Sequence, residues 1–166
     1  MKMYKVIDAA ISDIMKCRED GKSSTWRVAM DNDFHLWFMY DTFAAVRVPD
    51  EMDAFDSDKL AEFSGHKLYN ITNMIRTQVD EKEVGYEAEI PDPKDARKTL
   101  HRYQDTEGFY CYLSGKLQRI VEWLDDGTGG KCPIFHHKGC FRIYNDKGEV
   151  IAILLGVRRG GERDAK

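Results

Sequence analysis

The residue types best suited to chemistry lie in one short segment, Cys132-Pro-Ile-Phe-His-His-Lys-Gly-Cys140. Thiolate and imidazole groups are the usual zinc ligands, and His136 and His137 stand between the two cysteines. Structural zinc sites, however, usually combine two close pairs of ligands across a longer loop. Alternation along a strand would also send His136 and His137 to opposite faces. We therefore expect a strand here, and a small metal-binding protein or enzyme that uses this segment is kept as an alternative.

A cysteine nucleophile would need a histidine and an orienting carboxylate or amide beside it. No local motif selects such a trio around Cys111, Cys132 or Cys140. Cys111 lies in the apolar run 109–113, where a free cysteine most often acts as a small apolar filler. The irregular cysteine spacing does not suggest a disulfide framework, so free thiols are expected. We predict no catalytic residue, no metal ligand and no cofactor.

The other polar motifs favour structural roles. The glycine-rich segment 126–131 follows a predicted helix and precedes a predicted strand, which is the reverse of the order in a phosphate-binding P-loop. The acidic residues of 50–58 are expected to be solvated or to cap a helix. Aromatic residues interleave with charges and could form a stacking platform for single-stranded nucleic acid, but burial in a core is favoured. These aromatic residues are Trp26, Phe34, Trp37, Phe38, Tyr40 and Phe43.

A helix followed by closely spaced strands is predicted twice. In the second copy, the strand 109–113 leads into a helix over 114–124 with Ser114 as its N-cap. Strands over 133–137, 140–144 and 149–157 follow. In the first copy, apolar residues at 7, 10, 11, 14 and 15 predict a helix, and strands are expected over 25–30, 34–40 and 43–48. The repeat predicts an α+β fold built of two helix-plus-antiparallel-strands units.

The region between the two copies has a different pattern. Ser57 is expected to cap a helix that Gly65 splits, and the alternation of 83–90 predicts a strand. Pro91 and Pro93 are expected to break regular pairing, and 95–103 is predicted to be a short polar helix. The chain is thus expected to be one domain, 1–166, which divides into a first unit 1–49, a helical insertion 50–106, a second unit 107–158 and a flexible tail 159–166.

Composition excludes some classes of protein. The 42% of apolar and 33% of charged residues are typical of a folded globular chain rather than a disordered one. A formal net charge of -4 gives no general affinity for nucleic acid, so any such contact must use a local patch. No apolar run approaches the roughly 18 residues that cross a bilayer, and the N-terminus lacks the apolar core of a secretory signal. We expect a cytoplasmic protein with no membrane partner.

The two copies resemble the paired motif of one domain of a DNA polymerase sliding clamp. Ser114 to Leu124 resembles the clamp helix, and Cys140 to Arg158 resembles the closing hairpin of the family, with Gly156 in place of a proline. Asp33 to Pro49 resembles a clamp strand pair, although the aspartate-glycine-histidine-arginine type of turn of the bacterial family is missing. The resemblance covers the two ends of the chain and leaves the middle unmatched.

The resemblance implies a non-catalytic binding or assembly module with duplex DNA as its first-choice partner. Clamp rings contain six such domains around a basic central hole. This chain supplies one domain, so a ring would need about six copies of the chain or another partner. Pairing of exposed sheet edges could join the copies of a homo-oligomer. A protein-interaction adaptor is the other alternative. The cationic residues expected to contact DNA from the two helices and their ends are Lys5, Lys16, Arg18, Lys22, Lys116 and Arg119.

Overall fold

The computed structural model describes residues 3–41, 43–50, 56–76, 80–124 and 132–157 of the chain. These residues contain four helices and ten strands, so the expected α+β class is confirmed. The chain divides into two compact units, residues 1–78 and residues 79–166. None of the described helices combines the length and the apolar character needed to cross a membrane. The expected single domain 1–166 stays a prediction.

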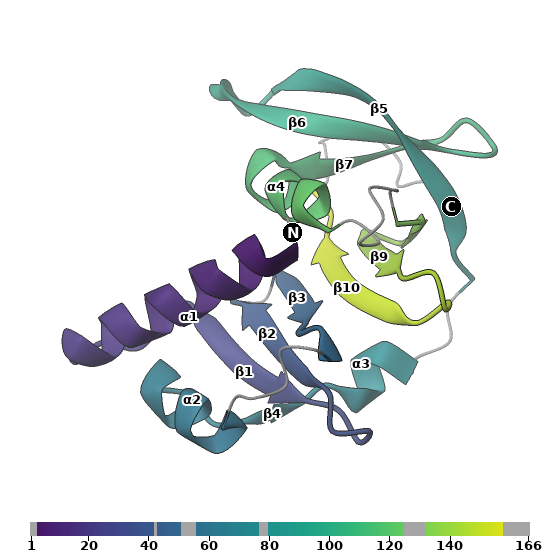
Figure 1. The fold of residues 1–166 in the computed structure, drawn as a ribbon. Coiled ribbons are helices and arrows are strands. Elements are labelled where there is room, and N and C mark those ends of the chain that lie inside the picture. The colour runs from purple at the N-terminus through teal and green to yellow at the C-terminus, as the bar shows by residue number, and fades with distance from the viewer. Residues whose placement is uncertain (1–2, 42, 51–55, 77–79, 125–131, 158–166) are drawn as a thin grey trace. The chain divides into compact units, whose positions relative to one another are not determined.

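The described residues of 1–78 form three helices and four strands, drawn from purple to blue in Figure 1. Antiparallel pairs join β1 to β2 and β2 to β3, and β4 pairs with β1 in parallel, which gives the strand order β4-β1-β2-β3. The elements are α1 (Met3–Glu19), β1 (Trp26–Met30), β2 (Leu36–Tyr40), β3 (Ala44–Arg47), α2 (Ser57–Ser64), β4 (Tyr69–Asn70) and α3 (Thr72–Arg76).

The apolar residues of α1 form its buried face. Ile7, Ala10 and Ile14 recur at the helical 3/4 spacing, and their exposed fractions are all 0%. Val28 of β1 and Phe38 of β2 are equally buried. Since α2 packs on both β1 and α1, the core of this unit lies between the strands and these helices (Figure 1).

Gly65 ends α2 as the sequence indicated. Its φ of 78° is left-handed, and its N–H donates to the carbonyl of Glu62, which is a common glycine cap. The N-cap is Asp56 rather than the expected Ser57, because the Asp56 side chain accepts from the N–H of Lys59. The predicted helix is therefore divided into α2 and α3, with the short strand β4 between them.

Residues 79–166 form one helix and six strands among the described positions, drawn from teal to yellow in Figure 1. All strand neighbours pair antiparallel in the order β10-β9-β8-β5-β6-β7. The elements are β5 (Lys82–Asp92), β6 (Asp95–Asp105), β7 (Tyr110–Ser114), α4 (Gly115–Trp123), β8 (Ile134–His137), β9 (Cys140–Tyr144) and β10 (Val150–Leu155).

The expectation of a helix over 95–103 is wrong. This segment forms most of β6, which pairs with β5 on one side and with β7 on the other. The local sequence is compatible with a helix, but strand pairing on both sides satisfies its backbone groups and buries Leu100 and Tyr103. Pro91 does not end β5 either, because it still pairs opposite Thr99 and the register shifts only at the next residue.

The description of 50–106 as a helical insertion is consequently wrong for its second half. Its first half holds α2, β4 and α3, whereas its second half is the long β5–β6 hairpin. In chain order, α1 precedes β1, β2 and β3, and α4 precedes β8, β9 and β10. The glycine-rich segment 126–131 and the tail 159–166 lie outside the described residues.

Candidate functional site

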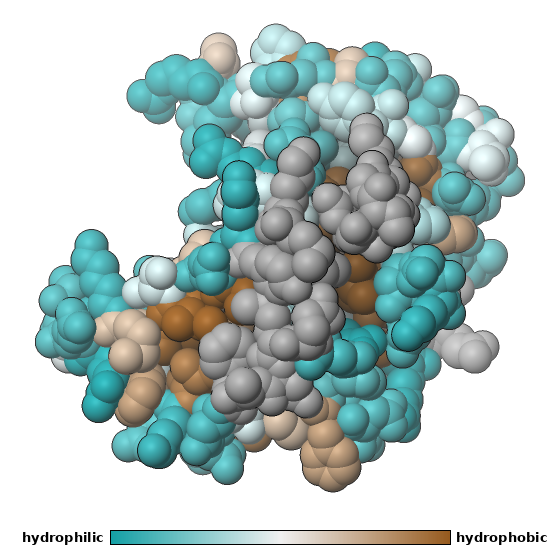
Figure 2. Space-filling model, in the orientation of Figure 1, coloured by the Kyte–Doolittle hydropathy of each residue, from teal (hydrophilic) through white to brown (hydrophobic). Residues whose placement is uncertain are grey.

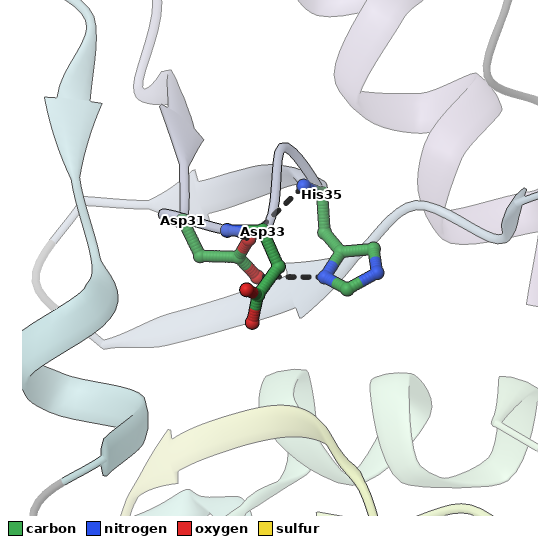
Figure 3. A group of neighbouring side chains, drawn as sticks. All are labelled: Asp31, Asp33 and His35. Atoms are coloured by element: carbon green, nitrogen blue, oxygen red, sulfur yellow. Dashed lines mark hydrogen bonds and ion pairs between the residues drawn. The ribbon is translucent and has the colours of Figure 1, made fainter.

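Two groups of polar side chains have the composition of a functional site. The first lies in the turn between β1 and β2, where Asp31, Asp33 and His35 each offer one ligand atom within 4.8 Å of the others. Figure 3 shows the Asp31 carboxylate facing the His35 ring, with Asp33 beside them. Carboxylate and imidazole groups bind divalent cations, so these residues are candidate metal ligands.

Asp31 organises this turn. Its Oδ1 accepts the backbone N–H groups of Asp33 at 2.9 Å and His35 at 3.0 Å. Its Oδ2 accepts the indole N–H of Trp37 at 3.1 Å and lies 3.0 Å from Nδ1 of His35. Burial would raise the pKa of Asp31, but these hydrogen bonds outweigh it and hold the pKa below its ordinary value. The carboxylate is therefore held ionised by the turn.

The other two members of the cluster also have protein partners. Oδ2 of Asp33 lies 3.1 Å from Nη2 of Arg76, and Nε2 of His35 lies 4.0 Å from Oδ1 of Asp50. Nη2 of Arg47 donates to the same Asp50 oxygen at 3.0 Å. A cation would have to displace several of these contacts. The geometry of the cluster is thus explained by its role in fixing the turn.

The second group lines a pocket of about 420 Å³ in the unit 79–166. One wall is the exposed side of α4, and the other is the β5–β6 hairpin. A volume of this size suits a small ligand or a group projecting from a larger one. The lining residues are Glu89, Thr99, His101, Gly115, Lys116, Gln118, Arg119 and Glu122.

The sequence places the start of α4 at this pocket. Ser114 caps the helix by accepting the N–H of Leu117 at 3.3 Å, as predicted. Leu117 and Ile120 turn inward and are buried, so the side of the helix that carries Lys116 and Arg119 stays exposed. These two cations are three positions apart and lie next to each other on the helix surface.

Two side chains of β6 face the first residue of α4. A Cβ added at Gly115 would lie 3.7 Å from Oγ1 of Thr99 and 4.0 Å from Nε2 of His101. Nδ1 of His101 is 3.0 Å from the hydroxyl of Tyr86, so this contact fixes the ring with Nε2 near the helix start. The carbonyl oxygen of Thr99 would lie 3.8 Å from the same Cβ, so Gly115 leaves room for about one methyl group between the start of α4 and β6.

Gln118 is the buried polar residue of the pocket, with an exposed fraction of 7%. Its Oε1 accepts the hydroxyl of Tyr103 at 2.6 Å. Burial raises the pKa of that tyrosine, so the hydroxyl remains a donor. Among the described residues, the amide nitrogen of Gln118 has no hydrogen-bond partner. This nitrogen is not among the enclosed polar atoms that lack a partner, so water can reach it in the pocket.

The structure brings together two of the six cations expected to contact DNA, Lys116 and Arg119. The other four lie in the unit 1–78. Lys5 and Lys16 are exposed on α1, three helical turns apart and therefore on one side of it, and Lys22 is exposed beyond its end. The guanidinium of Arg18 instead lies 3.8 Å from the ring centre of Phe63 in α2.

The Cys132 to Cys140 segment does not gather its four candidate ligands. His136 is buried and packs its ring on Phe141, while the neighbouring His137 pairs opposite Cys140 and points to the other face. Within the described ranges, the turn of β1 and β2 is the sole place where three metal-ligating side chains converge. All four cysteines are free, as predicted.

Sequence reasoning missed Thr99 and His101 because it assigned their segment to a helix. The signal that could have found them is the alternation of Thr99, His101 and Tyr103, which places all three on one face of a strand. Asp31 and Asp33 lie between the predicted strands 25–30 and 34–40, and the run Asp-Asn-Asp-Phe-His offers three metal-ligating residue types within five positions. Comparison with protein-family models, with curated proteins and with solved structures found no match to this chain.

Proposed function

We propose that this chain is a non-catalytic binding module that contacts DNA and works in a clamp-like assembly in the cytoplasm. The observation that carries the proposal is the adjacency of Lys116 and Arg119 on the exposed side of α4. Cations on a helix surface neutralise backbone phosphates without reading the base sequence. Lys5 and Lys16, which share one side of α1, provide a second cationic surface of the same kind.

The order of the elements supports the clamp-like part of the proposal. Each unit places a helix before three strands, and these strands pair antiparallel in α1-β1-β2-β3 and in α4-β8-β9-β10. β4 stands at one end of the strand order of its unit and β7 at one end of the other. In β7 the carbonyl of Tyr112 already accepts the N–H of Val157 at 2.8 Å, so a second copy of the chain would pair with the remaining backbone groups of these edges. A homo-oligomer joined at these edges is part of the proposal.

Gly156 marks a departure from the clamp pattern that has a local structural reason. Its N–H donates to the carbonyl of Gly139 at 2.7 Å, and an added Cβ would lie 2.9 Å from the Phe141 ring. A proline could neither donate this hydrogen bond nor fit this space. The family's proline is therefore incompatible with this hairpin as it is built.

The test replaces both α4 cations, as Lys116→Gln with Arg119→Gln, and follows binding to a fluorescent DNA duplex over a series of salt concentrations. A plot of log affinity against log salt concentration has a negative slope. If both residues neutralise phosphates, this slope should become less steep by about 1.8, which is about 0.9 for each lost contact. The matched control is Lys94→Gln with Lys147→Gln, which removes the same charge from two exposed turn positions. If both double variants show the same slope, Lys116 and Arg119 of α4 do not contact DNA.

A protein-interaction adaptor is the second candidate, and one observation favours it. Phe34 is 77% exposed at the tip of the β1–β2 turn, and Leu68 and Tyr69 are exposed beside it around a pocket of about 340 Å³. Figure 2 shows apolar surface in tan over this turn among mainly hydrophilic residues. The core burial that the sequence favours for the aromatic residues of this region does not hold for Phe34 and Phe43, which are exposed. Phe34→Ser should abolish partner binding, but not DNA binding, if this surface is the functional one.

A further inference from the structure

His136 connects the turn between β8 and β9 to the interior of the unit 79–166. The residue is 4% exposed, and its ring centre lies 4.8 Å from that of Phe141. Nε2 of the ring accepts the backbone N–H of Gly139 at 3.2 Å. A backbone N–H can only donate, so Nε2 carries no proton in this arrangement. The turn as it is built therefore requires a neutral imidazole ring at His136.

Gly139 extends this requirement to the strap 156–157, which follows β10. The carbonyl of Gly139 accepts the N–H of Gly156 at 2.7 Å. The next N–H, that of Val157, donates to the carbonyl of Tyr112 in β7 at 2.8 Å. One glycine thus receives support from His136 through its N–H and holds the strap through its carbonyl.

Phe141 of β9 gives a second connection between His136 and the strap. It pairs opposite His136, and a Cβ added at Gly156 would lie 2.9 Å from the Phe141 ring. Cys140 and Arg142, the neighbours of Phe141 in β9, point to the other face of the sheet because side chains alternate along a strand. A movement of the His136 ring would therefore also change the packing of the ring against which the strap lies.

The turn itself is closed at a steric cost. Lys138 and Gly139 have φ values of 43° and 80°. Two-residue hairpin turns with positive φ at both positions favour asparagine or aspartate before the glycine. Lys138 stands at that position, where a residue with a long side chain is disfavoured. Loss of the hydrogen bond to Gly139 would let this turn relax.

The charges that β5 and β6 bring near His136 oppose a positive ring. Lys82 of β5 pairs opposite His136, and its Nζ lies 2.5 Å from Oε2 of Glu107. The hydrogen bond to Glu107 raises the pKa of Lys82, and Asp105 at the end of β6 acts in the same direction. Lys82 is therefore cationic, and protonation of His136 would place a second positive charge near it in buried surroundings, which is unfavourable.

We infer that His136 is an acid-sensitive latch, which holds the strap 156–157 over β7 while its ring is neutral and releases the strap when its ring is protonated. A protonated ring carries a proton on both nitrogens, so Nε2 would meet the N–H of Gly139 as a second donor. Release of the strap frees the carbonyl of Tyr112 to pair with another strand. In the homo-oligomer, acid would then open this edge to a second copy of the chain, and this consequence alone rests on the proposed function.

The first measurement is amide hydrogen exchange of the ¹⁵N-labelled full-length chain between pH 7 and pH 5, expressed as protection factors. An open latch binds a proton with the ordinary imidazole pKa of about 6.5, so the closed latch is fully stable above this pH and loses stability below it. Protection at Gly139, Gly156 and Val157 should decrease about tenfold for each pH unit below about 6.5. The amides of the β5–β6 hairpin should keep their protection. An equal decrease throughout the unit 79–166 would be acid unfolding of the whole unit and would overturn the inference.

The variant His136→Gln removes the titrating ring and keeps an acceptor. A glutamine amide oxygen can accept the N–H of Gly139 but binds no proton in this range, so protection at Gly139 should stay constant from pH 7 to pH 5. His66→Gln is the matched control and should keep the pH dependence of the wild type. Nε2 of His66 lies 2.8 Å from the carbonyl oxygen of Ser24, so it donates there, and a protonated ring keeps this bond. A pH dependence that persists in His136→Gln overturns the latch.

A direct readout uses the wild type alone. The side-chain ¹⁵N resonances of His136 should show an unprotonated Nε2 at pH 7. A proton on Nε2 at pH 7 would contradict the hydrogen bond on which the latch depends.

Light scattering at the same pH values separates the latch from the proposed function. Release of the strap together with a larger mass, in the wild type but not in His136→Gln, supports both the latch and pairing at β7. Release at an unchanged mass supports the latch and counts against a homo-oligomer joined at β7. Constant protection at Gly139, Gly156 and Val157 overturns the latch and leaves the proposed function standing.

Discussion

Replacement of Asp31 by alanine should destabilise the unit 1–78 by about 3 kcal/mol. The indole N–H of Trp37, whose residue is 1% exposed, would lose its acceptor, and a buried donor left unsatisfied costs about 2 kcal/mol. Loss of the side-chain acceptor for the N–H groups of Asp33 and His35 resembles the loss of a helix cap and costs about 1 kcal/mol more. Asp33→Asn is the matched control, since Asp33 is exposed and its ion pair with Arg76 lies at the surface, where such pairs contribute about 0–1 kcal/mol.

The assay is equilibrium unfolding in urea followed by tryptophan fluorescence. The background should carry Trp123→Phe, because the remaining Trp26 and Trp37 both lie in residues 1–78 and then report on this unit by themselves. Separate reporting matters because a chain with two compact units need not unfold in one transition. If Asp31→Ala lowers the free energy of unfolding no more than Asp33→Asn does, the view that Asp31 organises the turn is refuted.

The Asp31 carboxylate should also make the stability of the unit 1–78 increase with pH in the acidic range. The pKa of Asp31 is lower in the folded chain than its ordinary value, so the folded state binds fewer protons and stability increases with pH through this range. The contribution is complete above the unfolded pKa of about 3.9 and is lost as the pH falls through the lower, folded pKa. The stability difference between wild type and Asp31→Asn should therefore shrink between pH 7 and pH 2.5. A difference that stays constant would contradict this role.

Four further predictions concern other parts of the fold. Gly65→Ala should lower the free energy of unfolding in urea by about 1–2 kcal/mol, because the φ of Gly65 is 78° and the added Cβ would lie 2.6 Å from Oγ of Ser23. Tyr103→Phe should cost about 1–2 kcal/mol by leaving Oε1 of buried Gln118 without its donor. In the wild type, tyrosinate absorbance should show that Tyr103 ionises above the ordinary range, since burial raises its pKa. Elemental analysis should find equal metal content in wild type and Cys132→Ser, and loss of a bound metal ion in the variant would support the metal alternative instead.

Much of the fold could be predicted because the relevant signals are local. The spacing of Ile7, Ala10 and Ile14 indicates one helix, and Ser114 marks the start of another. Gly65 ends α2 because glycine adopts the left-handed conformation of a helix end without a steric cost. The strands from β8 to β10 follow from short apolar runs and the turn residues between them.

The pocket could not be predicted because it depends on pairing between distant segments. Residues 95–103 have a sequence compatible with a helix, and their conformation is decided by hydrogen bonds to β5 and β7. With that segment assigned to a helix, nothing in the sequence brings Thr99 and His101 to Gly115. The turn that carries exposed Phe34 also depends on distant residues, since the N–H of Asn32 donates to Oγ1 of Thr72 and Asp33 pairs with Arg76.

By itself, the sequence determined the α+β class, the start of α4 at Ser114, the end of α2 at Gly65, most element positions and the presence of two cations three residues apart on a helix. These properties follow from backbone and side-chain preferences within a few residues. Only the tertiary structure decided that the second half of the insertion is a hairpin, that Arg18 contacts Phe63 and that Lys116 and Arg119 share a pocket with β6. Such properties depend on the free energy of contacts between residues far apart in the chain. A pattern within a few residues does not report that free energy.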